Sequence, residues 1–205
     1  MNKLIIVGAS GHGKVVADIA LLNGYDKIYF VDDNSNIKSL GNYEVIGSFD
    51  SIFDLAANEY DVFAGIGNAS VRQRMQNQLE QKGYNVVTLI HPSAFVARDV
   101  KIGVGTVVMA GAVVNAGTVI GKGCIINTSS SVDHDNNIGD YVHVSVAAHT
   151  AGTVSVGTNT WIGIGAVISN NISISRDVTI GAGAVVVKDI CESGTYVGVP
   201  IKKIR

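Results

Sequence analysis

The chain contains little cysteine, proline or aromatic residue, and it has no strong excess of charge of either sign. Only two of its 205 residues are cysteines, which argues against a disulfide framework and for a cytoplasmic location. The formal net charge is −2, and no basic run exceeds a lysine pair, so nucleic acid is not expected as a partner. No apolar run is long enough to span a membrane, and the first residues reach glycine too early for a signal peptide.

Glycine, in contrast, is abundant, with 24 residues, and a six-residue repeat accounts for it. Between Val96 and Val186 every sixth residue is isoleucine or valine, except Thr150. The residue four positions further on is mostly small or apolar. A period of six fits neither a helix nor one long strand. It predicts a solenoid in which three hexapeptides form one triangular coil and residues 18 apart stack. A purely structural spacer is the alternative interpretation.

The first ninety residues follow a different pattern, in which short apolar runs alternate with helical segments. This alternation predicts a small parallel α/β sheet of the Rossmann-like type. The residues His91-Pro92 mark the expected boundary between a domain of residues 1–90 and a domain of residues 91–205. Strands are expected at 4–7, 27–31, 61–66 and 84–90, and helices from Gly13 to Gly24 and over 69–82.

A glycine-rich loop, Gly8-Ala-Ser-Gly-His-Gly13, follows the first expected strand. Its spacing differs from the dinucleotide fingerprint, but its glycines let the backbone approach a phosphate, and a helix N-terminus favours negative charge. His12 can contact a phosphate or a sugar, and Asp32 at the end of the second strand can bind sugar hydroxyls or uracil. A tight turn without a ligand is the alternative. NAD is less well supported, because only half of the usual sheet is present.

Three of the five histidines, His134, His143 and His149, fall within one predicted coil, together with Thr150. His134 is flanked by two aspartates, and a carboxylate neighbour raises the basicity of an imidazole. Such a base can accept the proton of a sugar ammonium. Because adjacent strand residues point to opposite sides, one aspartate is expected to contact the ring and the other to be a solvated turn residue. A histidine without a catalytic role at the rim of the prism is the alternative.

His134 and His143 are nine residues apart, which is half of a coil. This spacing places them on different faces of one prism, so a symmetric oligomer is needed to bring them into one pocket. No spacing typical of a zinc site is present, and no metal is expected. Neither cysteine lies beside a histidine, so no acyl-enzyme is expected.

The chain resembles the PglD/NeuD family of sugar acetyltransferases over nearly its whole length. The motifs that carry the resemblance are Gly8-Ala-Ser-Gly-His-Gly13, Phe30-Val-Asp-Asp33, Ala64-Gly-Ile-Gly-Asn68, Leu89-Ile-His-Pro-Ser-Ala94, Asn127-Thr-Ser-Ser, Val132-Asp-His-Asp135, His143-Val-Ser-Val146, Ala151-Gly152 and Tyr196-Val-Gly-Val-Pro-Ile-Lys202. The resemblance implies a Rossmann-like α/β domain followed by a left-handed parallel β-helix. It also implies a homotrimer with active sites between subunits.

The resemblance also implies roles for individual residues. His134 matches the catalytic base, and Asp135 matches an acid, commonly glutamate, that strengthens this base. Four residues match contacts to the co-substrate acetyl-CoA, namely His143, Asn127, Ile164 and Ala182. Six residues match the nucleotide-sugar pocket, namely Ser10, Gly11, His12, Asp32, Asp33 and Gly67.

The expected reaction is transfer of an acetyl group from acetyl-CoA to the amine of a nucleotide-linked sugar of the UDP-4-amino-4,6-dideoxy type. The amine attacks the thioester directly, with a histidine as general base. Two alternatives stay open: a sialic acid O-acetyltransferase, and a non-catalytic partner protein that binds a nucleotide sugar.

Overall fold

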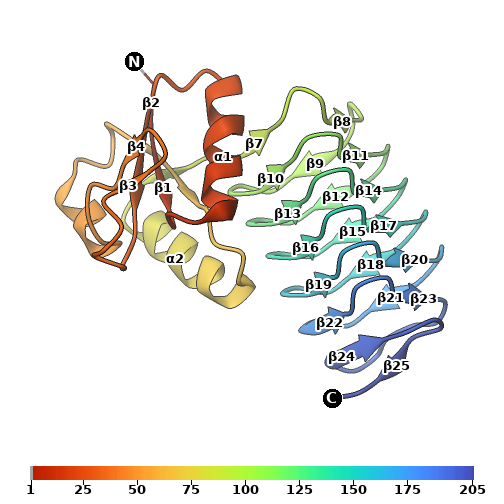
Figure 1. Cartoon of the computed structure of the whole chain (residues 1–205). Coiled ribbons are helices and arrows are strands. Elements are labelled where there is room, and N and C mark those ends of the chain that lie inside the picture. Colours follow the sequence, from red (N-terminus) through yellow and green to blue (C-terminus); the bar gives the residue numbers. More distant parts are fainter. Residues whose placement is uncertain (1) are drawn as a thin grey trace. The chain divides into compact units, whose positions relative to one another are not determined.

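A computed structural model describes residues 2–205. The chain divides into two compact units, the first ending at Ile90 and the second running from His91 to Arg205. Figure 1 shows the α/β elements of the first unit and the stacked coils of the second.

The first unit is built on a sheet of four parallel strands in the order β2-β1-β5-β6. Its strands are β1 (Lys3–Val7), β2 (Lys27–Val31), β5 (Asp61–Ala64), β6 (Asn85–Val86) and, outside this sheet, β7 (Leu89–Ile90). Its α-helices are α1 (Gly11–Leu22) and α2 (Ala69–Gln81). Strand β1 pairs with a parallel neighbour on both sides, and its residues Leu4 to Val7 are buried, as expected of a short apolar run in a parallel sheet.

The predicted α/β elements are confirmed, with differences at their ends and in the segment between β2 and β5. The third strand ends at Ala64 rather than at residue 66, because Asn68 caps α2 and the chain must turn before it. The last expected strand is split into β6 and β7. An antiparallel pair, β3 (Ser39–Leu40) and β4 (Tyr43–Glu44), and a 3₁₀ helix at Asp50–Asp54 were not predicted, since they are too short to show a period.

The second unit is a triangular parallel β-helix, and its three sheets form three faces of a prism. Most strands have two residues, one inward and one outward. Face I contains β10 (Val107–Val108), β13 (Ile125–Ile126), β16 (His143–Val144), β19 (Trp161–Ile162), β22 (Val178–Ile180) and β24 (Gly194–Val197), to which β25 (Lys202–Lys203) adds antiparallel. Face II contains β8 (Phe95–Val96), β11 (Val113–Val114), β14 (Ser131–Val132), β17 (His149–Thr150), β20 (Val167–Ile168) and β23 (Val185–Val186). Face III contains β9 (Lys101–Ile102), β12 (Val119–Ile120), β15 (Asn137–Ile138), β18 (Ser155–Val156) and β21 (Ser173–Ile174).

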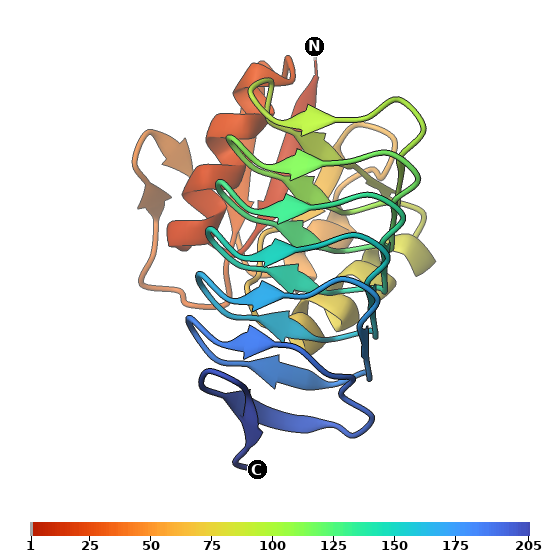
Figure 2. The same cartoon turned by 90° about the vertical axis from the view of Figure 1, so that its right-hand side faces the viewer.

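Strand pairs in this prism join residues that are 18 apart, as the repeat predicted: Val114 pairs with Val132, and Val132 with Thr150. Figure 2 shows these coils stacked one on the next. The inward aliphatic residues from Val108 to Val186 are buried, and Thr150 is buried among them. Burial of each valine or isoleucine contributes roughly 1.5–3 kcal/mol, and only stacked coils make this burial available.

The corners of the prism use a left-handed backbone at every sixth residue. This series runs from Gly105 to Gly183 and includes non-glycine residues such as Asp135, with φ of 56°. The left-handed residue stands three positions after each inward aliphatic residue. Inward threonines also join the coils. Thr106 Oγ1, for example, donates to the Gly121 carbonyl and accepts from the Cys124 N–H.

Candidate active site

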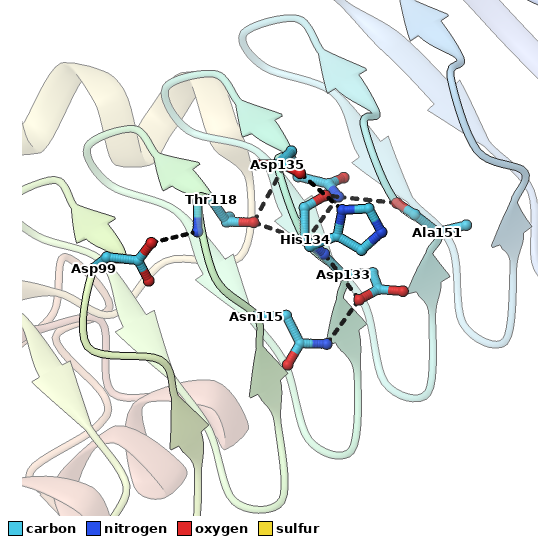
Figure 3. A network of polar contacts seen from close by, with 9 residues as sticks. Asp99, Asn115, Thr118, Asp133, His134, Asp135 and Ala151 are labelled. Atoms are coloured by element: carbon cyan, nitrogen blue, oxygen red, sulfur yellow. Dashed lines mark hydrogen bonds and ion pairs between the residues drawn. The ribbon is translucent and has the colours of Figure 1, made fainter.

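His134 lies on the edge between face II and face III, in the turn that joins β14 to β15. Its Nδ1 is 2.8 Å from Oδ2 of Asp135 (Figure 3). Asp135 adopts the left-handed conformation that aspartate tolerates better than most residues. Because Nδ1 donates its hydrogen to a carboxylate, the lone pair of the neutral ring is on Nε2. Aspartate, which is shorter than the glutamate common at this position in the family, thus still reaches the imidazole.

The two neighbouring aspartates make His134 more basic. The hydrogen bond that His134 donates to Asp135 is the main reason why the pKa of His134 is raised, and the charges of Asp133 and Asp135 add to it. The side chain of His134 is 58% exposed, so the imidazole is open to an incoming substrate.

Asp133 is not the solvated turn residue that the sequence suggested. Its Oδ1 accepts from the His134 backbone N–H and from Nδ2 of Asn115, both at 2.8 Å. These hydrogen bonds lower the pKa of the Asp133 carboxyl. The prediction was wrong because it considered only the alternation of side chains along a strand, whereas the partner of Asp133 lies on the preceding coil.

A buried asparagine holds the backbone of this turn. Nδ2 of Asn136 lies within hydrogen-bonding distance of three carbonyl oxygens, those of Asp133 (2.8 Å), His134 (3.1 Å) and Ala151 (2.9 Å). Thr118 supports the same turn, because its Oγ1 donates to the Asp133 carbonyl and accepts from the Asn136 N–H. The sequence analysis missed Asn136. A signal existed, since it is the only amide in a column of inward residues that otherwise holds Val100, Thr118, Val154, Ile172 and Ile190.

His143 lies on face I, and its ring is fixed on two sides. Nδ2 of Asn127 is 3.0 Å from His143 Nε2, and the amide orientation follows from the Thr128 N–H, which donates to Asn127 Oδ1. His143 Nε2 is therefore the acceptor, and Nδ1 of the neutral ring carries the hydrogen. The indole of Trp161 stacks on the imidazole, with centroids 6.2 Å apart and planes at 16°. Trp161, a further residue missed by the sequence analysis, donates its Nε1–H to Ser145.

Ile164 and Ala182 lie in turns on the edge between face I and face II, 18 residues apart and both exposed. The Gly183 N–H donates to the Ile164 carbonyl at 2.8 Å, so the two turns are stacked directly. Asn127 lies in a turn on the same edge. Three of the four residues assigned to acetyl-CoA, Asn127, Ile164 and Ala182, thus follow one edge of face II, and the fourth, His143, lies on face I beside Asn127. His134 and Asp135 lie on the other edge of face II. A single chain keeps the two sets apart.

The residues assigned to the nucleotide sugar all follow the carboxyl ends of β1, β2 and β5, which are neighbours in the sheet. Ser10 caps α1, and Asn68, next to Gly67, caps α2. Asp32 accepts from the N–H groups of Ala9 and Asn34, both at 2.8 Å. Both aspartates thus hold loops at this edge, since Asp33 Oδ1 accepts from the Phe49 N–H.

His12 lies in the first turn of helix α1. Its burial and the nearby guanidinium of Arg72 lower the pKa of His12 to about 4, so the imidazole is neutral at pH 7. Its Nε2 is buried and has no hydrogen-bond partner among residues 2–205. Arg72 is fully buried and donates to the carbonyls of Ile66 and Gly67. The sequence analysis missed this arginine, because it stands in the polar pattern of α2.

The first unit also has an open pocket of about 480 Å³ between α1 and the β3–β4 hairpin. It is lined by Lys14, Asp18, Leu21, Leu40, Gly41, Asn42 and Tyr43, so none of the residues assigned from the sequence line it. Within residues 2–205, no three histidine, cysteine or acidic side chains gather in a way that could hold a metal ion. No helix in the same range is long and apolar enough to cross a membrane.

Residues 3–79 match the family model of the PglD N-terminal domain. The chain is 37% identical over 113 residues to the UDP-N-acetylbacillosamine N-acetyltransferase of Bacillus subtilis (strain 168), a match that covers 54% of this chain and only about half (52%) of that relative. It is 30% identical over 169 residues to the GDP-perosamine N-acetyltransferase of Escherichia coli O157:H7, which covers 78% of this chain and 75% of that one.

Two solved structures are similar over the whole chain. The acetyltransferase domain of PglB from Neisseria gonorrhoeae FA1090 is 39% identical, with a TM-score of 0.96 and full coverage of both chains, and one of its structures contains acetyl coenzyme A. PerB from Caulobacter crescentus, in complex with CoA and GDP-perosamine, is 34% identical, with a TM-score of 0.95 and coverage of 100% of this chain and 98% of that one.

Proposed function

Since the chain belongs to the PglD-type family of acetyl-CoA-dependent sugar N-acetyltransferases, we propose that it acetylates the amine of a nucleotide-linked amino sugar, with His134 as general base. The observation that carries this proposal is the exposed imidazole of His134, held by Asp135 with its Nε2 lone pair directed away from the carboxylate. The substrate we propose is a UDP-4-amino-4,6-dideoxy sugar. The named relatives support the class, since one is named for a UDP sugar and another for a GDP sugar.

The proposed reaction needs only one proton acceptor. The sugar amine attacks the thioester carbonyl carbon, a C–N bond forms, and the C–S bond to coenzyme A breaks. His134 Nε2 takes the proton that the amine loses, and the imidazolium passes this proton, directly or through water, to the leaving sulfur, which becomes the free thiol. A base of raised pKa suits this transfer, because it binds the proton of the attacking amine more strongly.

His143 is proposed to contact the acetyl end of acetyl-CoA as a hydrogen-bond donor. Asn127 occupies its Nε2, so the hydrogen of the neutral ring is on Nδ1. A donor directed at the thioester oxygen stabilises the negative charge that develops there as the amine attacks. Stacking against Trp161 supports this role, because it restrains the ring plane. The backbone groups of Ile164 and Ala182, on the adjoining edge, are proposed to face the rest of coenzyme A.

We place each active site between two copies of the chain. His134 lies on one edge of face II, and Asn127, Ile164 and Ala182 lie on the other, with His143 beside Asn127 on face I. A ring of copies that turns face II inward therefore brings one edge of each chain to the other edge of its neighbour. The outward residues of face II support such a contact, because four of the six are apolar, and Phe95 (58%) and Val167 (38%) are exposed. A homotrimer is the ring that we propose.

The first unit, with residues 1–90, is proposed to bind the nucleotide sugar, and residues 91–205 to bind acetyl-CoA. The loops after β1 and β5 flank the place where the strand order reverses, which is where open α/β sheets bind ligands. The N-termini of α1 and α2 lie at the same strand ends and favour a diphosphate. The buried Nε2 of His12, which has no partner among residues 2–205, adds a hydrogen-bonding group for a sugar hydroxyl or a phosphate oxygen. The free thiols of Cys124 and Cys191 support a cytoplasmic location.

The test is to mix the purified protein with acetyl-CoA and a UDP-4-amino-4,6-dideoxy sugar and to follow the release of free thiol. We expect turnover with the amino sugar, little with sialic acid, and a loss of kcat of roughly 10²–10⁴-fold in His134→Ala. Preference for sialic acid would instead indicate an O-acetyltransferase. Binding of the nucleotide sugar in calorimetry without any binding of coenzyme A would indicate a non-catalytic partner. Full activity of His134→Ala would remove the proposed base.

A further inference from the structure

Two glycines border the His134–Asp135 pair, one on the preceding coil and one on the next. A Cβ added at Gly152 would lie 2.5 Å from Cε1 of His134 and closer still to its Nε2. A Cβ added at Gly117 would overlap Oδ1 of Asp135 in the same way. Each member of the pair therefore occupies space that an ordinary residue on the neighbouring coil would fill.

The backbone of the prism does not itself require glycine at position 152. Its φ lies outside the left-handed region, unlike that of Gly117, and the three atoms nearest to an added Cβ all belong to the imidazole of His134. At Gly139 and Gly157, in contrast, an added Cβ would collide with the backbone of the next coil. The same corner also accommodates larger side chains elsewhere, since the column of residues 18 apart reads Arg98, Ala116, His134, Gly152, Asn170 and Lys188.

We propose that Gly152 is a positioning residue of the acetyl transfer: its missing side chain leaves the room in which the Nε2 edge of His134 lies and through which the substrate proton reaches it. This role rests on the proposed function, because it concerns the same base. It adds a second structural requirement to the hydrogen bond between His134 and Asp135. The base must be both held at Nδ1 and left open at Nε2.

The direct test is Gly152→Ala in the assay of thiol release. An added methyl group either covers Nε2 or displaces the ring, so kcat is expected to fall at least tenfold. Complete loss of a general base usually lowers the rate more, by roughly 10²–10⁴-fold. KM for both substrates is expected to stay within about threefold, and the midpoint of thermal unfolding within a few degrees, because no backbone atom is in the way. Asn170→Ala, in the same column one coil further on, is the control that is expected to leave kcat unchanged.

A double-mutant cycle separates a role through His134 from any other effect. In the His134→Ala background the ring is gone, so Gly152→Ala is expected to change the residual rate by less than about twofold. An equal loss of rate in both backgrounds, or full activity of Gly152→Ala, would overturn the proposal.

A readout independent of turnover is the NMR signal of the His134 Cε1–H. Gly152→Ala is expected to shift this signal, while that of His149, which contacts Ser131 on face II, stays in place. A shifted His134 signal in a protein that has no acetyltransferase activity would refute the proposed function but not the position of the ring. An unchanged signal would refute the role of Gly152, whatever the activity.

Discussion

Oδ2 of Asp135 lies 2.8 Å from Nδ1 of His134, although the two residues are adjacent in the chain. Neighbours on a strand point to opposite sides, so this contact depends on the left-handed backbone of Asp135, which turns its carboxylate back toward the ring. The turn thus supplies both the proposed base and its partner within two residues.

Asp135→Asn is expected to shift the acid limb of the pH profile of kcat/KM to lower pH. His134 must be unprotonated to act as a base, and its pKa is raised chiefly by Asp135, so wild-type activity is lost as pH falls through a value above the ordinary pKa of histidine. Asp133 remains the other charged neighbour, since residues 115–117 and 151–153 of the adjoining coils carry no charge. We also expect kcat on the alkaline plateau to fall about tenfold.

The control for this substitution is Asp177→Asn. Asp177 has the same left-handed backbone, with φ of 57°, but lies on a different edge of the prism. Its profile should overlay that of the wild type. An unmoved acid limb in Asp135→Asn would mean that the carboxylate does not set the basicity of His134.

Asn136→Val is expected to reduce both stability and activity. Valine fits the column, where Val154 stands one coil further on, but it removes the amide that bonds to the carbonyls of Asp133, His134 and Ala151. Loss of partners for buried polar groups costs about 1–3 kcal/mol in free energy of unfolding. Because these carbonyls belong to the turn that holds the proposed base, kcat should fall about tenfold or more in the thiol assay.

Thr106→Val provides the matched comparison for Asn136→Val. It removes the hydrogen bonds of Thr106 to Gly121 and Cys124, so it is expected to cost a similar free energy of unfolding. Thr106 lies on the edge between face III and face I, a different edge from that of His134, so the substitution should leave kcat unchanged. If both variants lost stability but kept the kcat of the wild type, Asn136 would contribute to the stability of the fold and not to catalysis.

His12 is expected to make the first unit less stable in acid. Its pKa is near 4 in the folded chain and near 6.5 when unfolded, so between these values the unfolded chain binds a proton that the folded one does not. The free energy of unfolding should therefore decrease by up to about 3 kcal/mol as pH falls from 6.5 to 4. Denaturant titrations of wild type and His12→Asn at several pH values check this, and parallel pH curves for the two proteins would contradict it.

Val167→Glu is expected to break the assembly and abolish turnover, since it places a charge on the apolar part of face II. Val119→Glu is the matched variant on face III, where Val119 is similarly exposed, at 42% against 38% for Val167. Sedimentation should show monomers for the first variant and the wild-type assembly for the second. Monomers that kept full activity would argue against shared sites.

The sequence predicted the prism better than the site, for a physical reason. One residue in six must be aliphatic in every coil, so the repeat is visible without any knowledge of neighbours. The roles of Asn136 and Gly152 depend instead on what lies 18 residues before or after them, and on the direction of individual side chains. Arg72 was missed because burial of an arginine depends on carbonyl partners that no pattern reveals. Trp161 was missed because it is a single aromatic residue whose partner, His143, lies on the previous coil.

The most direct test of a site shared between chains is to combine two inactive variants. His134→Ala and His143→Ala each lack one histidine, and the proposed trimers, assembled from an equal mixture, should contain some contacts at which both histidines are present. If each site takes His134 from one chain and His143 from its neighbour, co-expression should restore about a quarter of the wild-type rate. Mixed assemblies, verified by two affinity tags, that remain as inactive as the separate variants would contradict the account.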